Sequence, residues 1–312
     1  MKIVFMGTPE AAAKSLHRLI ANGHEIVAVY TQPDRPAGRG KHFAASPVKE
    51  FALEHGFKVC QPLKIKTPEA LEEFRSHKAD LAVVVAYGRI LPETFLNTFK
   101  YGALNVHFSL LPKYRGAAPV NWAIVSGETE TGVTVMQMDA GLDTGAILCQ
   151  RSTPIGPSET SVELMQRLGD LGAELISESL SQIHSLKPIR QNDADATLAP
   201  IMKKEDGLID WHRSATEIER RVRGFQPFPS SYTFHNGSRL TVWQAEPIDP
   251  SDGQPGEIVE ATGDRLVVVC GQSTALRILE IQPEGKRRMP TRDLLNGSKI
   301  EIGDILGSSP TE

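Results

Sequence analysis

The sequence predicts an α/β domain with a doubly wound, mostly parallel sheet, followed by a small C-terminal β-barrel of the OB type. In the first half, short apolar runs alternate with amphipathic helical segments, which is typical of a parallel sheet with crossover helices. Residues 186–206 are polar, contain two prolines and do not continue this alternation. Short strands separated by glycine and polar turns follow. We therefore expect an α/β domain at 1–187, a linker at 188–206 and a second domain at 207–312.

The strands expected in the first domain are 2–7, 25–33, 58–62, 80–88, 102–107, 131–139 and 146–155. Residues 80–88 form the most apolar run, so this strand should be central. Helices are expected over 9–23, 46–56, 67–77 and 160–184, and Gly23 and Gly56 should end the first two. Ser46 followed by Pro47 predicts a helix start, and Thr160 with Glu163 forms a capping-box pattern.

The second domain should contain one helix, near 214–225, before several short strands. Residues 231–243 predict a hairpin, because Asn236-Gly237 supplies the positive φ angles of a tight turn. Further strands are expected at 256–261, 265–270 and 275–282.

The 312-residue chain is long enough for two domains with a core each, and its net charge is −4. Neither half is strongly basic, so net charge does not support a nucleic-acid partner, and local basic clusters are judged separately. No window has the length of a membrane span, and the N-terminus lacks the apolar run of a signal peptide. Cys60, Cys149 and Cys270 show no disulfide or metal spacing, which indicates a reduced, cytoplasmic compartment.

Reactive side chains follow the ends of predicted strands, where open α/β sheets bind ligands. Asn105 and His107 are two residues apart at the end of one strand, so both side chains point to the same side. Asp143 lies in the Gly-rich segment after the next strand. An amide can donate to an oxyanion, an imidazole can move a proton, and a carboxylate can orient the imidazole. Without a nucleophile elbow, this set favours direct acyl transfer to a nitrogen nucleophile.

Each of these residues also has a structural interpretation. Asp143 and Asn105 are equally suited to turns, and a lone histidine at a strand end is more often structural than catalytic. The turn "GTP" after the first strand lacks the G-x-G-x-x-G fingerprint, so we predict no dinucleotide cofactor. His24, His42, His55 and His77 show no ligand spacing with carboxylates, so we predict no metal.

Several motifs resemble a known family. The segments "NVHFSLLPKYRGAAPV" and "TGVTVMQMDAGLDTG" resemble the two catalytic motifs of formyltransferases that use 10-formyltetrahydrofolate. The segments "FMGTPE", "TQPDRPAGRGKHFAASPVK", "KKEDGLIDW" and "QPEGKRRM" narrow the match to the methionyl-tRNA formyltransferase family, over essentially the whole chain. One departure is Phe108, where the family more often has a small residue or proline.

The resemblance implies a catalytic trio of Asn105, His107 and Asp143, with 10-formyltetrahydrofolate as donor and initiator methionyl-tRNA as acceptor. It also implies no metal, no membrane partner, a cytoplasmic location and a monomer. The folate contacts it implies are Tyr87, Gly88, Arg89, Ile90, Ser109, Leu110, Leu111 and Pro112.

The long segment 33–48 is rich in proline, glycine and cations, so we expect an extended loop that cannot join the sheet. The resemblance makes it an element that reaches the tRNA acceptor end, with Arg39 as the strongest contact candidate. The tRNA contacts expected in all are Arg35, Arg39, Lys41, Arg220, Arg221, Arg223, Lys286, Arg287 and Arg288. A solvated surface is the ordinary alternative for each of these clusters.

Three other functions remain open from the sequence. A formyltransferase of the same fold could act on a nucleotide-sugar or glycinamide ribonucleotide amine, or the formyl donor could be hydrolysed. A non-catalytic tRNA- or folate-binding protein is a different class, and it would have no need of the complete trio.

Overall fold

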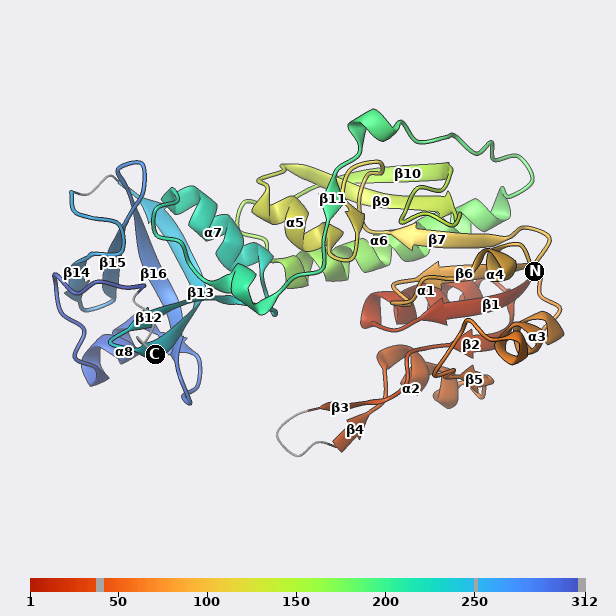
Figure 1. Cartoon of the computed structure of the whole chain (residues 1–312), viewed down its shortest axis with the longest axis horizontal. Helices are drawn as coiled ribbons and strands as arrows, with labels where there is room; N and C mark the ends of the chain where they lie inside the picture. Colours follow the sequence, from red (N-terminus) through yellow and green to blue (C-terminus); the bar gives the residue numbers. More distant parts are fainter. Residues whose placement is uncertain (38–41, 250–251, 308–312) are drawn as a thin grey trace. The chain divides into compact units, whose positions relative to one another are not determined.

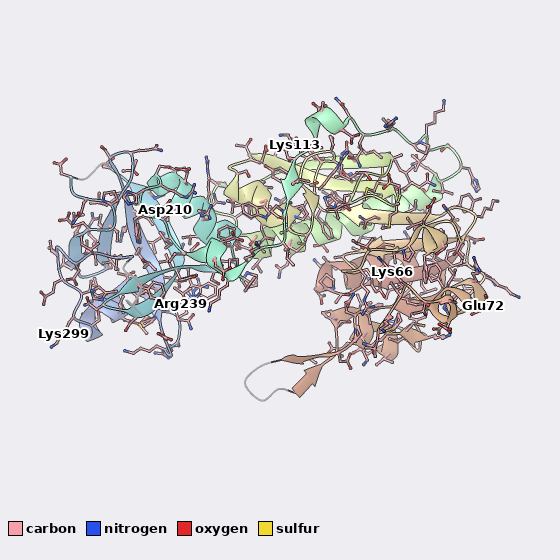
Figure 2. The ribbon with its side chains drawn as sticks, in the orientation of Figure 1. Lys66, Glu72, Lys113, Asp210, Arg239 and Lys299 are labelled. Atoms are coloured by element: carbon pink, nitrogen blue, oxygen red, sulfur yellow. The ribbon has the colours of Figure 1, made fainter. Side chains whose placement is uncertain are left out.

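The structure is a computed structural model that describes residues 1–37, 42–249 and 252–307 (Figure 1). These residues form two compact units. The first contains Met1–Pro119, Glu130–Pro154 and Glu163–Pro200, and the second contains Val120–Thr129, Ile155–Val162 and the described chain from Ile201 onward. Two short segments from the first half of the sequence therefore cluster with the C-terminal unit. Charged side chains such as Lys66 and Glu72 in the first unit and Lys299 in the second are exposed (Figure 2).

The first unit is built on a seven-stranded sheet with the order β10-β9-β7-β6-β1-β2-β5. Its strands are β1 (Lys2–Gly7), β2 (Glu25–Tyr30), β5 (Val59–Cys60), β6 (Leu81–Val85), β7 (Ala103–His107), β9 (Glu130–Gln137) and β10 (Ile147–Pro154). Only β9 runs against the others, pairing antiparallel with both β7 and β10. The prediction of a mostly parallel sheet is confirmed. The prediction for the most apolar run is also confirmed, because β6 is the middle strand and all its residues are buried.

Helices α1 (Glu10–Ala21), α2 (Pro47–Glu54), α3 (Pro68–Ser76) and α6 (Ser161–Ser181) occupy the predicted segments. The predicted start of α2 is confirmed, because the Ser46 hydroxyl accepts a hydrogen bond from the Lys49 N–H at 3.1 Å and Pro47 begins the helix. Thr67 and Pro68 begin α3 in the same way. The short helix α4 (Glu93–Leu96) was not predicted, because four residues show no period. No helix in the described ranges is both long and apolar enough to cross a membrane.

The segment 33–48 is not the irregular loop that its composition predicted. It forms a two-stranded antiparallel sheet of its own, from β3 (Arg35–Ala37) and β4 (His42–Ala44). The expectation that it stays out of the main sheet is confirmed. Residues 38–41, and with them Arg39 and Lys41, lie outside the described residues.

The segment 188–206, expected as a linker, contains short elements: η1 (Asp193–Asp195), β11 (Leu198–Ala199) and η2 (Lys204–Gly207). Strand β11 pairs in parallel with β8 (Arg115–Gly116), which directly follows the Asn105–His107 motif in the chain. Gln191 and Ala199 are buried. Up to Pro200 this segment is therefore part of the first unit.

Within the described ranges, the second unit contains an antiparallel sheet and three α-helices. The helices are α5 (Pro119–Val125), α7 (Ala215–Gly224) and α8 (Thr291–Gly297). The strands are β12 (Ser231–His235), β13 (Ser238–Ile248), β14 (Ile258–Thr262), β15 (Arg265–Cys270), β16 (Thr274–Pro283) and β17 (Met289–Pro290), in the order β12-β13-β16-β15-β14 with β17 beside β16. The predicted hairpin is confirmed, because Asn236 and Gly237 join β12 to β13 with φ angles of 47° and 77°. Trp211, Ile218 and Val222 belong to the buried core of this unit.

The Phe108 ring packs against helix α6. Phe108 is buried, and a Cβ atom added to Gly172 of α6 would lie 3.3 Å from the Phe108 Cε1 atom. The same Cβ would lie 2.9 Å from the Val106 Cγ1 atom. The bulky residue at position 108 is accommodated because α6 has a glycine opposite Val106 and Phe108.

We predict that Gly172→Ala destabilises the protein. Overpacking in a core lowers the free energy of unfolding by about 1–3 kcal/mol, whereas the higher helix propensity of alanine raises it by about 1 kcal/mol. We expect a net loss of about 1 kcal/mol, measured as a lower midpoint of urea unfolding of the first unit. Gly297→Ala in α8 of the second unit is the control for alanine at a helical glycine without close neighbours, because nothing lies within 4 Å of a Cβ atom there, and it should not lower the unfolding midpoint of its own unit. An unchanged or raised midpoint for Gly172→Ala would contradict the packing.

Candidate active site

Asn105 and His107 lie at the carboxyl end of β7, as predicted, and both are largely buried, with 8% and 5% of their surface exposed. Their side chains share one side of the strand because residues two apart point the same way. Asp143 reaches the same place from the loop between β9 and β10. Its carboxylate Oδ2 lies 3.7 Å from the His107 Nδ1 atom, so the structure brings together the imidazole and the carboxylate that the sequence singled out.

The His107 ring is oriented by a backbone carbonyl. Its Nε2 atom lies 2.9 Å from the Tyr114 carbonyl oxygen. Because a carbonyl can only accept, Nε2 carries the hydrogen, and in the neutral ring Nδ1 has a lone pair facing Asp143. A distance of 3.7 Å is too long for a hydrogen bond. In the neutral ring no hydrogen lies between Nδ1 and the carboxylate, so Nδ1 can accept a proton there.

The neutral form of His107 is the favoured one. Burial lowers the pKa of His107 below its usual range, and the Asp143 charge and the Tyr114 carbonyl oppose this only in part. At neutral pH, His107 is therefore a base rather than a cation. If it takes a proton, Nδ1–H faces Asp143 and the two groups form an ion pair.

The Asn105 side chain has no hydrogen-bond partner within the described part of the chain, although the residue is 8% exposed. Neither polar atom of this amide is among the fully buried atoms that lack a partner, so the amide still reaches solvent. Asn105 therefore offers its donors to something that the protein itself does not supply, such as a substrate oxygen.

The Asp143 carboxylate is held by a backbone hydrogen bond. The Gly116 N–H donates to Oδ2 at 2.9 Å, so two groups of Tyr114–Gly116 orient both members of the His107–Asp143 pair. Gly116 has a φ of +126°, and a Cβ atom there would lie 2.5 Å from the Ala199 carbonyl oxygen. Only glycine fits this position between β8 and β11.

Sequence reasoning missed two buried polar residues beside the site, Arg115 and Gln191. Gln191 donates to the carbonyl oxygens of Asp143 and Gly145, both at 2.8 Å. Arg115 donates to the Gln191 side-chain oxygen through Nε at 3.0 Å and Nη2 at 2.8 Å. No periodic or motif signal marks Gln191, because it lies in the segment whose lack of period predicted a linker.

Comparisons with known proteins give the same assignment as the geometry. Residues 1–180 match the family model described as formyl transferase, and residues 201–299 match formyl transferase, C-terminal domain. A methionyl-tRNA formyltransferase of Citrifermentans bemidjiense is 51% identical over 98% of this chain and 96% of its own. One of Caldanaerobacter subterraneus is 50% identical over 98% and 100%.

This chain belongs to the methionyl-tRNA formyltransferase family. It is therefore an enzyme of formyl transfer, and the family uses a folate-type donor. Among solved structures, an N-formyltransferase of Helicobacter canadensis in complex with folinic acid and dTDP-3-aminofucose has the same fold, with a TM-score of 0.68 and 20% identity over 91% of this chain and 99% of that one. HypX of Aquifex aeolicus in complex with tetrahydrofolic acid has a TM-score of 0.61 and 18% identity, over 95% of this chain and 47% of its own.

The residues expected to contact folate lie in two turns. In the first, Ala86 and Gly88 have positive φ angles, and the Tyr87 carbonyl accepts from Gln32 at 2.9 Å. Tyr87 is buried, which raises the pKa of its phenol to about 12. Ile90 is 66% exposed, and Arg89 donates to the Leu63 carbonyl at 2.9 Å. The Ile90 side chain is thus the one that this turn leaves most open.

The second turn, Ser109–Pro112, is braced from β9 and β10. Thr134 donates to the Ser109 carbonyl at 2.7 Å, and Gln150 donates to the Leu111 carbonyl at 2.8 Å. The Ser109 hydroxyl donates to the Lys113 carbonyl at 2.6 Å. Ser109 and Leu111 are buried, so these contacts give the turn its shape, and the less buried Leu110 and Pro112 are its outer residues.

The expected tRNA contacts differ in how they are paired. Arg223 forms an ion pair with Glu219 and donates to the Glu159 carbonyl at 2.9 Å, and Arg221 donates to the Asp206 carbonyl at 3.1 Å. Arg288 forms an ion pair with Glu280. Arg220, Lys286 and Arg287 have no ion pair within the described ranges. The Arg35 side chain, like Arg39 and Lys41, is outside what the structure describes.

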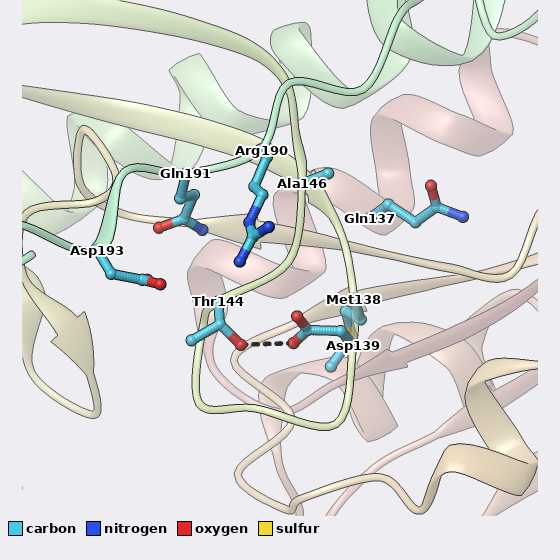
Figure 3. A pocket seen from close by; sticks show the side chains of 8 residues that line it. All are labelled: Gln137, Met138, Asp139, Thr144, Ala146, Arg190, Gln191 and Asp193. Carbon is cyan, nitrogen blue, oxygen red and sulfur yellow. Dashed lines mark hydrogen bonds between the residues drawn. The ribbon is translucent and has the colours of Figure 1, made fainter.

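A polar cavity of about 480 Å³ lies beside the Asp143 loop (Figure 3). It is lined by Gln137, Met138, Asp139, Thr144, Ala146, Arg190, Gln191 and Asp193. Thr144 donates to the Asp139 carboxylate at 2.7 Å across the neck of the loop. The cavity is therefore lined both by Thr144 of the Asp143 loop and by Gln191, which donates hydrogen bonds to that loop.

His77, for which no metal role was predicted, lies near Cys60 and Glu73 in the first unit. Within the described residues, these three form the group whose ligand atoms are close enough to share an ion, all within 4.8 Å of one another. The ring already bonds to the Tyr30 hydroxyl at 2.9 Å, and Lys58 pairs with Glu73 at 3.1 Å. These partners account for the cluster as a hydrogen-bonded group.

We predict that Asn105→Ala lowers kcat by about two to three orders of magnitude, as the loss of an oxyanion donor does. The midpoint of thermal unfolding should stay the same or rise, because the amide has no partner to lose. Steady-state formyl transfer and a melting curve measure both. Asn97→Ala, at the exposed end of α4, is the matched control and should change neither. Near-normal turnover of Asn105→Ala would remove this residue from the catalytic set.

Proposed function

We propose that this enzyme transfers the formyl group of 10-formyltetrahydrofolate to the α-amine of initiator methionyl-tRNA, for translation initiation. The observation that carries the proposal is the His107–Asp143 pair, with a neutral imidazole whose lone pair faces a carboxylate, beside an unpartnered Asn105 amide. This set suits attack by an amine on a formyl carbon. About half the residues are identical to curated methionyl-tRNA formyltransferases along nearly the whole of both chains.

The proposed reaction is a direct acyl transfer. The free amine forms a bond to the formyl carbon, and the carbonyl oxygen becomes an oxyanion. This oxyanion accepts a hydrogen bond from the Asn105 amide N–H. His107 takes the proton that the amine loses, and the resulting imidazolium is stabilised by Asp143. The bond from the formyl carbon to N10 then breaks, N10 takes up a proton, and the oxyanion returns to a carbonyl.

We propose that the folate lies against the two turns 87–90 and 109–112. Ile90, Leu110 and Pro112 are the apolar groups that these turns leave partly or largely exposed. The contacts behind each turn, from Gln32 and from Thr134 and Gln150, hold the backbone in one shape. A rigid apolar wall with backbone polar groups suits a pterin ring.

We propose that Arg220, Lys286 and Arg287 are the leading phosphate contacts of the second unit, because their side chains form no ion pair within the part of the chain that the structure describes. Arg221, Arg223 and Arg288 then support the surface, since each is held by a carbonyl or a carboxylate. Arg35, Arg39 and Lys41 are proposed to reach the acceptor end. The enzyme is proposed to act as a cytoplasmic monomer, consistent with three free cysteines.

The sugar formyltransferases that share the fold represent the nearest alternative, but they are about 20% identical to this chain, and that likeness concerns the fold alone. The proposal is tested by mixing the purified enzyme with labelled 10-formyltetrahydrofolate and one of four acceptors: charged initiator tRNA, charged elongator tRNA, an amino-sugar nucleotide or glycinamide ribonucleotide. Transfer to initiator methionyl-tRNA is expected. Release of free formate, or transfer only to a small-molecule amine, would overturn it.

We predict that Arg220→Ala raises KM for tRNA by about three- to tenfold and reduces the salt dependence of tRNA binding by about one phosphate contact. Arg223→Ala is the contrasting variant, because it removes the Glu219 and Glu159 contacts and should lower unfolding stability instead. Titration with tRNA at several salt concentrations, with melting curves, separates the two effects. An unchanged salt slope for Arg220→Ala would remove it from the tRNA surface.

A further inference from the structure

We propose that Gln191 is a positioning residue that holds Asp143 opposite His107, and that Arg115 fixes the orientation of the Gln191 amide. The inference rests on the proposed role of Asp143 and adds residues that neither the motifs nor the comparisons assign. It concerns the segment after α6, which the sequence predicted to be a linker.

Every polar atom of the Gln191 amide is used. Its two N–H groups donate to the carbonyl oxygens of Asp143 and Gly145, each at 2.8 Å. Its oxygen accepts two N–H groups of Arg115, at 3.0 and 2.8 Å. Gln191 is 5% exposed, so little water competes for these bonds. The amide therefore holds the loop backbone at Asp143 itself and again two residues later, at Gly145.

Arg115 decides which way the amide faces. A guanidinium can only donate, so the Gln191 oxygen must face Arg115 and the NH₂ group must face the two carbonyls. Arg115 is 7% exposed and also pairs with Asp193 at 2.9 Å, while the Asp193 side chain is 70% exposed. The buried cation is thus held by both Gln191 and Asp193 and cannot turn away freely.

The Asp143 loop needs such a clamp because its backbone is strained. Asp143 has a φ of +54°, a left-handed conformation that side-chain-bearing residues rarely adopt. The loop closes tightly, since a Cβ atom on Gly145 would lie 1.9 Å from the Gln137 carbonyl oxygen. Within the described residues, the Asp143 carboxylate itself accepts a hydrogen bond from the Gly116 N–H at 2.9 Å. Without Gln191, relaxation of the backbone would carry the carboxylate away from Nδ1.

The competing explanation is that Gln191 only satisfies the buried Arg115. Gln191→Glu separates the two roles. A carboxylate keeps an acceptor for Arg115 and strengthens that contact, but its second oxygen would face the carbonyls of Asp143 and Gly145 and repel them. If Gln191 positions the loop, this variant folds normally and is slow. If Gln191 serves only Arg115, it is as active as the parent, and the proposal is overturned.

The experiment uses the full-length enzyme with saturating tRNA and folate. We expect Gln191→Leu and Gln191→Glu to lower kcat by about 10- to 100-fold, since a displacement of about 1 Å has that effect, with KM for both substrates nearly unchanged. Asn192→Ala is the matched control, because its side chain bonds only within η1, and it should leave kcat unchanged. If Gln191→Leu does not fold, Arg115→Lys, which keeps the charge but loses the paired donors, replaces it.

The double variant Gln191→Leu with Asp143→Asn decides the matter. A residue that acts through Asp143 should add less than about twofold to the loss already caused by Asp143→Asn. Gln191→Leu and Asp143→Asn alone should each also move the acid limb of the pH profile of kcat to lower pH. The reason is that His107 loses the Asp143 charge that stabilises its protonated form. Fully multiplicative losses would overturn the positioning role. A fully active Asp143→Asn would instead overturn the proposed role of Asp143 itself.

Discussion

The backbone of Tyr114–Gly116 determines the chemistry of the site. The Tyr114 carbonyl fixes which nitrogen of His107 carries the hydrogen, and the Gly116 N–H holds the Asp143 carboxylate. Backbone groups on a segment that pairs with β11 cannot turn as side chains do. The imidazole lone pair and the carboxylate therefore face each other before any substrate arrives, so the charge that would stabilise a protonated His107 is already in place.

The same arrangement leaves polar groups in unfavourable states. Burial lowers the pKa of His107, the Asn105 amide has no partner in the described chain, and Asp143 has a left-handed backbone. The left-handed backbone of Asp143 opposes stability at any pH, whereas the lowered pKa of His107 opposes it only at acidic pH, where the unfolded chain binds the proton more readily. Active sites commonly hold groups in this way, because a group already satisfied by the protein has nothing to offer a reacting atom.

Much of the fold and half of the site were predictable from local pattern. The central position of β6 followed from its apolar run, and the hairpin at Asn236-Gly237 followed from the φ angles of its turn. Asn105 and His107 followed from strand periodicity and from the parallel-sheet rule. The parallel-sheet rule also placed Asp143 near His107, but the reason behind that prediction was wrong. Strand β9 is antiparallel to β7, so its carboxyl end lies away from His107, and only the loop brings Asp143 back.

The sequence by itself determined the class of both units, the family and the side chains that are proposed to react, because strand and helix periods and short motifs are local properties of the chain. The tertiary structure alone decided which groups orient those side chains. Gln191 is 48 residues from Asp143 along the chain, and Arg115 is 76 residues from Gln191. A contact over such distances leaves no period or motif, because it depends on where β8 and the segment after α6 are brought together by the packing of the whole first unit.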